Sequence, residues 1–180
     1  SGGIVGRMDL GSILSCDNYG KIISTDGNYT GGIAGKSDTI IRNSAAKCTL
    51  SGNDYVGGIA GKASKIINCQ TLVHVDESGE FTGAIAGDAD TGNLLKNYCV
   101  NDDLGGIDDI NYTAIAEQTT VDRFAAFVDN NFNKDVSFTL KFVADDKEVA
   151  ELKYNYKDSI PDEDIPPIPE KKGYYGKWSE

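Results

Sequence analysis

A short glycine-rich motif recurs along the first hundred residues, and this repetition constrains the fold more than any other feature of the chain. Its four copies are Gly2-Gly3-Ile4-Val5-Gly6, Gly31-Gly32-Ile33-Ala34-Gly35, Gly57-Gly58-Ile59-Ala60-Gly61 and Gly83-Ala84-Ile85-Ala86-Gly87, at offsets of 29, 26 and 26 residues. A second motif follows each copy: Ile13-Leu14-Ser15-Cys16, Ile40-Ile41-Arg42-Asn43, Ile66-Ile67-Asn68-Cys69 and Leu94-Leu95-Lys96-Asn97. A shortened fifth copy starts at Gly105. Because the two motifs keep a near-constant separation over four copies, they indicate a repeat architecture.

The composition of each repeat favours strands. A period near 26 residues is compatible with leucine-rich repeats, but β-branched residues alternate with Gly, Asn, Ser and Thr, and no repeat contains a helical run. We therefore predict a mainly all-β fold: a right-handed parallel β-solenoid with about 26 residues per coil. Equivalent side chains of successive coils then stack about 4.8 Å apart. The expected ladders are Ile4, Ile33, Ile59 and Ile85, and Ile13, Ile40, Ile66 and Leu94.

Three aromatic residues form a further column, each two residues before a glycine motif. They are Tyr29, Tyr55 and Phe81, at offsets of 26 and 26. Exposed stacked rings could bind the faces of sugars, which makes Tyr29 and Tyr55 candidate ligand-binding residues. Stacked aromatics are also an ordinary structural ladder. Because Phe81 has no hydroxyl for polar recognition, the column favours the structural interpretation.

The repeat resembles a known family. The glycine core, the aromatic residue before it and the Ile-x-Asn-Cys type element after it are similar to the GLUG repeat of large bacterial surface proteins, over residues 1 to about 100. The chain has Ile where that family has Leu, and Ala before the last Gly in three of four copies. The resemblance implies a spacer or presentation scaffold, because GLUG repeats occur in adhesin-like proteins and in the non-catalytic region of IgA-cleaving metallopeptidases.

A solenoid must cover its last hydrophobic layer, and residues 119–128 offer a cap. Val121, Phe124, Ala125 and Val128 have helical spacing, and Thr119 with Asp122 resembles a capping box. We therefore expect a short amphipathic helix over the final coil. The predicted domains are 1–118 for the solenoid, 119–134 for the helical cap and linker, and 135–180 for a separate C-terminal module.

The C-terminal module has a different period. Apolar residues alternate from Val136 to Phe142 and from Ala150 to Tyr156, with Asp145-Asp146-Lys147 between them, which predicts an antiparallel hairpin. Prolines between Pro161 and Pro169 exclude a central strand there. We expect Ile160, Ile165 and Ile168 to pin this crossing segment to the core, and the last residues, Gly173 to Trp178, to form a closing strand.

This order resembles the Listeria–Bacteroides repeat, a small β-grasp-like module of surface proteins. The resemblance covers about residues 136–180 and depends chiefly on Pro166 to Trp178. Since the sequence stops at Glu180, we expect the module to lack a final edge here. The aromatic residues Tyr174, Tyr175 and Trp178 are further candidates for contact with a host glycan or protein.

Charge and composition exclude several function classes. The chain carries 28 acidic and 17 basic residues, a net charge of −11, which argues against binding nucleic acid or an anionic membrane. No apolar run reaches the ~18 residues of a membrane span, so we expect no membrane insertion within this segment. Because the sequence starts inside a repeat and no signal-peptide pattern is visible, we expect a segment of a longer protein whose targeting signal and anchor lie outside it.

The sequence offers little catalytic chemistry. His74 is the sole histidine and is expected on a strand edge without function; no His-Glu-x-x-His motif is present. Cys16, Cys48, Cys69 and Cys99 lack CxxC spacing, and Cys16 and Cys69 are expected two coils apart, too far for a disulfide. We therefore expect buried free thiols.

Calcium is the one cofactor candidate. Asp26-Gly27-Asn28 and Gly52-Asn53-Asp54 offer oxygen ligands, although they match neither the EF-hand loop nor the Gly-Gly-x-Gly-x-Asp nonapeptide, and Asp and Asn favour turns in any case.

The resulting expectation is a non-catalytic segment, a stalk or adhesin part, at the extracellular surface of a bacterium. One alternative is a specific host glycan- or protein-binding module. Another is an accessory region of a secreted protease or glycan-degrading enzyme whose chemistry lies in a different domain. The presentation role suits a solenoid, because its length grows by adding coils without redesigning a core.

Overall fold

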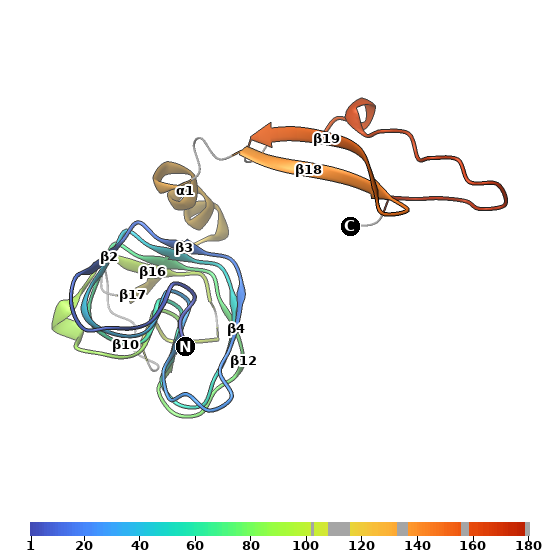
Figure 1. Ribbon diagram of the computed structural model, residues 1–180. Helices are drawn as coiled ribbons and strands as arrows, with labels where there is room; N and C mark the ends of the chain where they lie inside the picture. Colours follow the sequence, from blue (N-terminus) through green and yellow to red (C-terminus); the bar gives the residue numbers. More distant parts are fainter. Residues whose placement is uncertain (102, 108–115, 133–136, 156–158, 179–180) are drawn as a thin grey trace. The chain divides into compact units, whose positions relative to one another are not determined.

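The computed structural model describes residues 1–101, 103–107, 116–132, 137–155 and 159–178. The chain divides into two compact units, Ser1–Phe132 and Asn133–Glu180 (Figure 1). No helix in the described part is long and apolar enough to cross a membrane.

The first unit consists of coils that repeat the same sequence of short strands. The first coil contains β1 (Val5–Met8), β2 (Ser12–Leu14), β3 (Asp17–Asn18) and β4 (Lys21–Ile23); the second contains β5 (Thr30–Gly31), β6 (Ala34–Arg42), β7 (Ala45–Ala46) and β8 (Thr49–Ser51). The third contains β9 (Val56–Gly57), β10 (Ala60–Ile67), β11 (Gln70–Thr71) and β12 (His74–Glu77). The fourth contains β13 (Thr82–Gly83), β14 (Ala86–Ala89), a 3₁₀ turn (Thr91–Asn93), β15 (Leu94–Leu95) and β16 (Asn97–Cys99), and β17 (Ala116–Gln118) pairs with its last strand.

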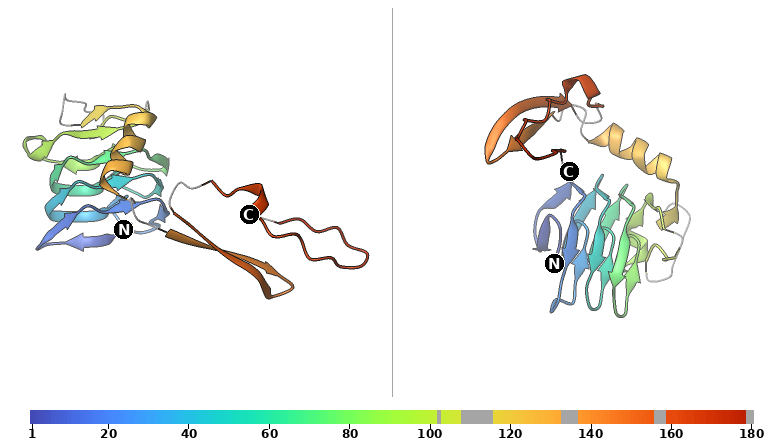
Figure 2. Two further views of the ribbon diagram at one scale, coloured as in Figure 1. Left: turned by 90° about the horizontal axis from the view of Figure 1, so that it is seen from above. Right: turned by 90° about the vertical axis from the view of Figure 1, so that its right-hand side faces the viewer.

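Strands of successive coils pair in parallel, so that the stack forms four sheets along its length. The sheet orders are β1-β6-β10-β14, β17-β16-β11-β7-β3, β12-β8-β4 and β13-β9-β5. The left view of Figure 2 shows the coils as layers, from blue to yellow. The predicted β-solenoid, with about four turns of about 26 residues, is confirmed.

The first isoleucine ladder forms the centre of the core. Ile33, Ile59 and Ile85 are fully buried, and the amide of each of the first two donates to the carbonyl of the next, at 2.9 and 2.7 Å. Ile4 pairs with this column through its backbone, but its side chain is 51% exposed because it lies in the first coil. The shortened fifth copy continues the column, since Ile107 is buried and bridges to Ala86.

The second ladder differs from the prediction by one residue in one coil. Ile13 and Ile66 both pair with Ile41, and Ile66 also pairs with Leu94; all four side chains are buried. The predicted member Ile40 is only half-buried. An irregularity between Ala63 and Lys65 gives the second coil one extra residue there. Because a slip of one residue moves a side chain to the opposite face, Ile41 takes the core position.

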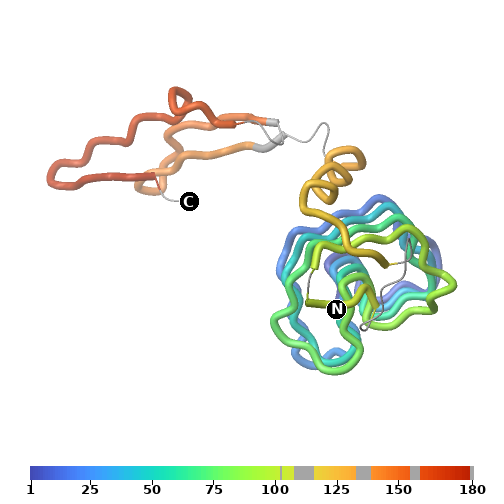
Figure 3. The backbone as a smooth tube through the Cα atoms, turned by 180° about the vertical axis from the view of Figure 1, so that it is seen from behind, coloured from blue at the N-terminus to red at the C-terminus, as the bar shows by residue number. Residues whose placement is uncertain are grey.

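Close approach of backbones explains the glycines of the motif. The chain begins in the middle of the coil (Figure 3), and the first glycine motif follows directly after this start. At the glycines of the later motifs, neighbouring backbone atoms lie too close to leave room for a Cβ atom. A Cβ atom on Gly58 would lie 1.9 Å from the carbonyl oxygen of Ala84 in the next coil, and one on Gly61 would lie 2.4 Å from the carbonyl oxygen of Tyr55. Only a residue without a side chain fits these positions.

A helix follows the last coil, as predicted, but with a different start and a different contact face. Helix α1 spans Val121–Asn131, and its N-cap is Thr120, not Thr119; the Thr120 hydroxyl accepts from the amide of Arg123. The packed face is Phe124 and Val128, continued by Phe132 beyond the helix end. Val121 and Ala125, expected on that face, are exposed.

The helix lies along the side of the stack and not over its end. Phe124, Val128 and Phe132 form a cluster with Ala45, and Leu72 and Val100 pack against it; these three residues come from three successive coils. The right view of Figure 2 shows the helix running beside the layers. The prediction of a cap over the final coil is therefore wrong. The outward-facing apolar residues of three successive coils form a strip along the side of the stack. The helix buries its apolar face against this strip and not against the end of a single coil.

The second unit contains the predicted hairpin. Strands β18 (Ser137–Ala144) and β19 (Lys147–Asn155) are antiparallel, and the turn residues Asp145 and Asp146 have φ of 48° and 59°, as in a type I′ turn. Val136 and Tyr156, at the ends of the predicted strands, lie outside the described residues. A 3₁₀ turn, Asp162–Asp164, follows.

The rest of the second unit departs from the prediction. Residues 173–178 form a turn and extended chain, so the closing strand is absent from the described residues, and the β-grasp-like architecture is not shown. Ile160, Ile165 and Ile168 are each about 40% exposed and do not pin the crossing segment to a core. The paired prolines and two flanking glycines favour turns over a ladder strand. As predicted, the proline-rich segment forms no strand.

The glycine packing gives a testable prediction. Replacing Gly61 with Ala should lower the free energy of unfolding by about 3 kcal/mol, because the new methyl group overlaps backbone atoms that cannot move independently. Urea unfolding followed by circular dichroism measures this change. Gly6→Ala is the matched control: it occupies the same motif position in the first coil, where nothing lies within 4 Å of an added Cβ. Equal effects of the two substitutions would contradict the packing account.

Candidate ligand-binding surfaces

The five aromatic residues singled out in the sequence fall into two separate groups. Tyr29 and Tyr55 belong to the solenoid unit, and Tyr174, Tyr175 and Trp178 to the C-terminal unit.

The solenoid tyrosines stack on one another. The ring centroids of Tyr29 and Tyr55 are 5.0 Å apart with the planes tilted by 36°, and those of Tyr55 and Phe81 are 4.7 Å apart and nearly parallel. Lys62 Nζ lies 5.7 Å from the centroid of the Tyr55 ring. The ring faces of Tyr55 that would bind a sugar therefore contact protein, which favours the structural interpretation of this column.

The backbone of the aromatic column adds to this interpretation. Tyr55 and Phe81 have φ of 46° and 58°, a left-handed conformation that costs about 1–2 kcal/mol for a residue with a Cβ. Ring stacking offsets part of this cost at each coil, since aromatic pairs contribute about 0.5–1.5 kcal/mol beyond burial. The column thus stabilises the left-handed turn before the third and fourth glycine motifs.

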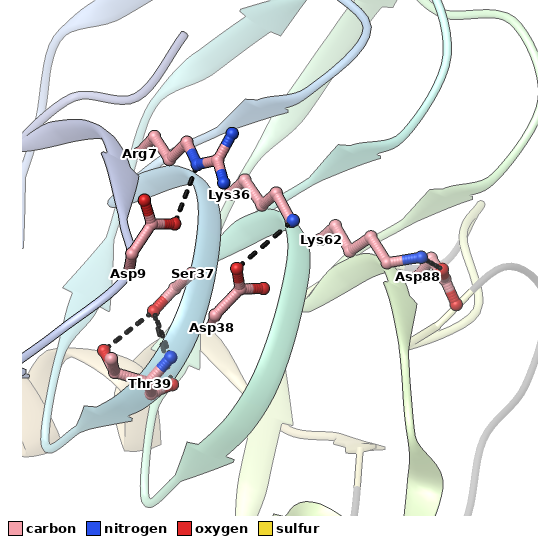
Figure 4. A network of polar contacts seen from close by, with 8 residues as sticks. All are labelled: Arg7, Asp9, Lys36, Ser37, Asp38, Thr39, Lys62 and Asp88. Carbon is pink, nitrogen blue, oxygen red and sulfur yellow. Dashed lines mark hydrogen bonds and ion pairs between the residues drawn. The ribbon is translucent and has the colours of Figure 1, made fainter.

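A column of charged residues runs through successive coils of the solenoid (Figure 4). Arg7, Lys36, Lys62 and Asp88 occupy equivalent positions in successive coils. The ion pairs are Arg7–Asp9 at 2.7 Å, Lys36–Asp38 at 3.3 Å and Lys62–Asp88. The hydrogen bond to Asp88 raises the pKa of Lys62. Each of these three cations has an aspartate partner, which reduces the repulsion between the stacked positive charges. No cation of this column is therefore free for a ligand.

The C-terminal unit contains a groove of about 610 Å³ between the hairpin and residues 168–178. Trp178 lines it, with Nε1 donating to the Pro166 carbonyl at 2.9 Å and the ring edge-to-face with Phe142 at 5.0 Å. Tyr174 also lines it and is 72% exposed, with Lys171 Nζ 5.5 Å from its ring centroid. Trp178 therefore holds the proline-rich segment on the hairpin, while Tyr174 presents open surface.

Tyr175 stands apart from this groove. It is fully exposed and is not among the residues that line the groove. The structure thus brings together Tyr174 and Trp178 of the predicted ligand-binding residues and leaves Tyr175 outside.

A second groove, of about 370 Å³, lies on the solenoid and was not predicted from the sequence. Three-residue segments of three coils form it: residues 19–21, 47–49 and 72–74. His74, expected to be a strand-edge residue without function, is one of them; its side chain is 78% exposed and its Nε2 lies 3.2 Å from Asp76. The three segments share no motif and are 28 and 25 residues apart, so the approximate repeat period was the only signal in the sequence that connected them.

Among the described residues, no group of three or more His, Cys, Asp or Glu side chains could hold a metal ion. In the proposed calcium loops, Asn53 donates through its side-chain amide to the Thr25 carbonyl of the coil before. The loop residues thus make coil-to-coil contacts, as Asn does in turns.

All four cysteines are free thiols, as expected; Cys48, Cys69 and Cys99 are also buried, whereas Cys16 is only half-buried because it lies in the first coil. Ser44 lies between Cys16 and Cys69: its hydroxyl accepts from the amide of Cys16, and its amide donates to the Cys69 sulfur. Burial raises the pKa of Cys48 and Cys69 to about 12 and that of Cys99 to about 11. The reactive thiolate form is therefore scarce at neutral pH.

Searches against protein-family models, curated proteins and solved structures found no match to this chain.

The thiol environments predict stepwise labelling. At pH 8 a disulfide-exchange reagent should react with at most one thiol of the native protein, the half-buried Cys16, and with all four after unfolding in guanidinium. The pKa of each of the other three lies well above this pH, so both burial and protonation slow them. A Cys16→Ser variant should show no native reaction. Rapid reaction of three thiols in the native protein would contradict the burial of Cys48, Cys69 and Cys99.

Proposed function

We propose that the repeat region is a non-catalytic presentation segment, a stalk or adhesin part, of a bacterial cell-surface protein. The observation that carries this proposal is the equivalence of the coils: the Ile33, Ile59 and Ile85 column and the Tyr29, Tyr55 and Phe81 column continue from layer to layer in the same register. Each added coil extends such a stack without a new kind of core.

The location follows from the same proposal. The GLUG-like motifs of the solenoid and the Listeria–Bacteroides-like order of the C-terminal unit both resemble modules of bacterial surface proteins, and two such resemblances in tandem support an extracellular place. Under this proposal the coils wind to the right, as nearly all parallel crossovers do. The C-terminal unit would then belong to a β-grasp-like family whose full fold exceeds the hairpin.

A binding role for the aromatic column has less support. The ring faces of Tyr55 contact Phe81 and Lys62, and Tyr29 is tilted against Tyr55. A sugar would have to displace these contacts to stack there. The column therefore contributes to the rigidity of the stalk.

Insertion of a coil tests the proposal. Duplicating residues 57–82 after Thr82 adds one period of 26 residues, and the protein should keep its thermal midpoint or raise it. Spin labels at Leu14→Cys and Leu95→Cys, which are exposed and in register, should move apart by about 4.8 Å for each coil inserted. Pulsed electron paramagnetic resonance in a Cys16→Ser background measures this distance.

The matched control inserts only residues 57–69, half a period. This insertion places core residues out of register and should lower the midpoint sharply. If the full-period insertion were as damaging as the half-period one, length would not be adjustable by coils, and the presentation role would lose its physical basis.

A further inference from the structure

One row of outward-pointing side chains crosses all four coils on the sheet that contains β2, β6, β10 and β15. Strand pairing aligns Leu14 with Arg42, Arg42 with Ile67, and Ile67 with Leu95. The residue before each of these four is buried in the core, so the four themselves point away from the core. We call Leu14, Arg42, Ile67 and Leu95 the outward row.

The outward row is apolar in three of its four positions, and much of it is exposed. Leu14 is 53% exposed and Leu95 48%, while Ile67 is half-buried. The methylene chain of Arg42 continues the apolar surface between Leu14 and Ile67, with its charged end toward solvent. Three steps between coils separate the two ends of the row, so it forms a strip about 14 Å long.

Cations without a carboxylate partner lie within this strip and on both sides of it. Arg42 belongs to the row, Lys65 lies two residues before Ile67, and Lys96 follows Leu95; all three cations are exposed. Among the residues that the structure describes, none of the three forms an ion pair. The segments that carry the strip, residues 12–14, 40–42, 65–67 and 94–96, contain no Asp or Glu. The strip therefore combines apolar surface with three positive charges of its own.

Helix α1 shows how such a strip is covered on another side of the same stack. Its apolar residues, spaced four apart from Phe124 to Phe132, pack against one apolar residue from each of three successive coils. Three or four helical residues rise about 4.5–6 Å, so a helix places one apolar side chain near each coil, about 4.8 Å from the next. An extended strand does not match this spacing, because its same-face residues are about 6.6 Å apart.

The strip, its charges and the packing of α1 together fit one kind of partner. We propose that the outward row is a docking surface for an amphipathic α-helix of another protein, with acidic side chains on both sides of its apolar face. The apolar face lies on the leucines and the isoleucine of the row, and one carboxylate binds the guanidinium of Arg42. Lys65 and Lys96 lie on opposite sides of the row and attract the two acidic flanks. About ten helical residues cover the strip.

This inference goes beyond the presentation role, and the two can fail separately. A stalk keeps its length whether or not a helix binds to its side, and coil insertion tests only the length. Helix docking concerns exposed side chains, which the buried columns of the stack do not need.

Titration of the full isotope-labelled chain with a synthetic peptide, followed by nuclear magnetic resonance, tests the inference. The probe is a helix-forming peptide of about 15 residues, with Leu at every third or fourth position and Glu on both sides of the leucine face. We expect saturable shifts at residues 12–14, 40–42, 65–67 and 94–96, with a Kd of about 0.1 mM or tighter. Raising the salt concentration should weaken binding.

Two control peptides separate the contribution of the apolar face from that of charge. A peptide of the same composition with Leu and Glu in scrambled order has no apolar face and should give no saturable shifts. A peptide with Lys in place of every Glu should bind at least about tenfold more weakly, because Arg42, Lys65 and Lys96 repel it.

Variants make the test specific to the outward row. Arg42→Gln and Leu95→Ser should each weaken binding of the acidic peptide about tenfold. Their thermal midpoints should be unchanged, because both side chains are exposed. The matched controls are Lys47→Gln and Ile23→Ser, which remove an exposed cation and a 59% exposed apolar side chain from other sides of the coil and should leave binding unchanged.

Any of four results would overturn the inference. They are no saturable shifts in the four segments, equal binding of the scrambled peptide, equal loss in Lys47→Gln and Arg42→Gln, or, without peptide, nuclear Overhauser contacts between the outward row and another part of the same chain. Binding to anionic lipid vesicles without binding to the acidic peptide would also overturn it, and would assign the row to a membrane surface.

Discussion

Hydrogen bonding between successive backbone layers is the constraint on which the rest of the solenoid depends. The amide of Ile33 donates to the Ile59 carbonyl, and that of Ile59 to the Ile85 carbonyl. The backbone hydrogen bonds of these strands are therefore made between neighbouring coils and not within one coil. At the centre of the coil the layers approach so closely that a Cβ on Gly58 would overlap the Ala84 carbonyl. The glycine motif therefore recurs with the layers because the packing that needs it recurs.

Once the layers are in register, equivalent side chains of successive coils must contact one another. Each column accommodates this contact differently. Isoleucines gain by stacking, because each buries apolar surface against its equivalent. Aromatic rings stack at about 5 Å, and cations in the charged column take nearby aspartates. The outer corner of the coil carries no such column, and there Tyr19, Lys47 and Leu72 differ from coil to coil. A surface free of the stacking requirement can vary in sequence from coil to coil.

Structural features that repeat from coil to coil could be predicted from the sequence, but features that occur only once could not. The 26-residue period and β-branched alternation led to the solenoid, and Asp145-Asp146 between alternating segments led to the hairpin. The one-residue irregularity that replaces Ile40 with Ile41 in the core leaves no mark in composition. Helix α1 packs against Ala45, Leu72 and Val100. These residues come from three coils, and their common outward direction becomes visible only in three dimensions, so the sequence did not show which helix face would pack or where.

The candidate site shows the same division. Tyr174 and Trp178 were found as an aromatic cluster at the end of a recognisable pattern, but the contact of Trp178 with Pro166 and Phe142 could not be read from spacing. The corner groove was missed because its residues belong to no motif. Their juxtaposition follows from the stack alone, so His74 was assessed as a single residue and not with Lys47 and Tyr19.

The most direct test of the account is a methyl nuclear Overhauser experiment on protein labelled at isoleucine methyl groups. The layered stack predicts strong cross peaks between Ile33 and Ile59 and between Ile59 and Ile85, which lie about 4.8 Å apart in successive layers. It predicts a weak or absent peak between Ile33 and Ile85, about twice as far apart. Absence of the two neighbouring-layer peaks would contradict the parallel stack on which every other conclusion depends.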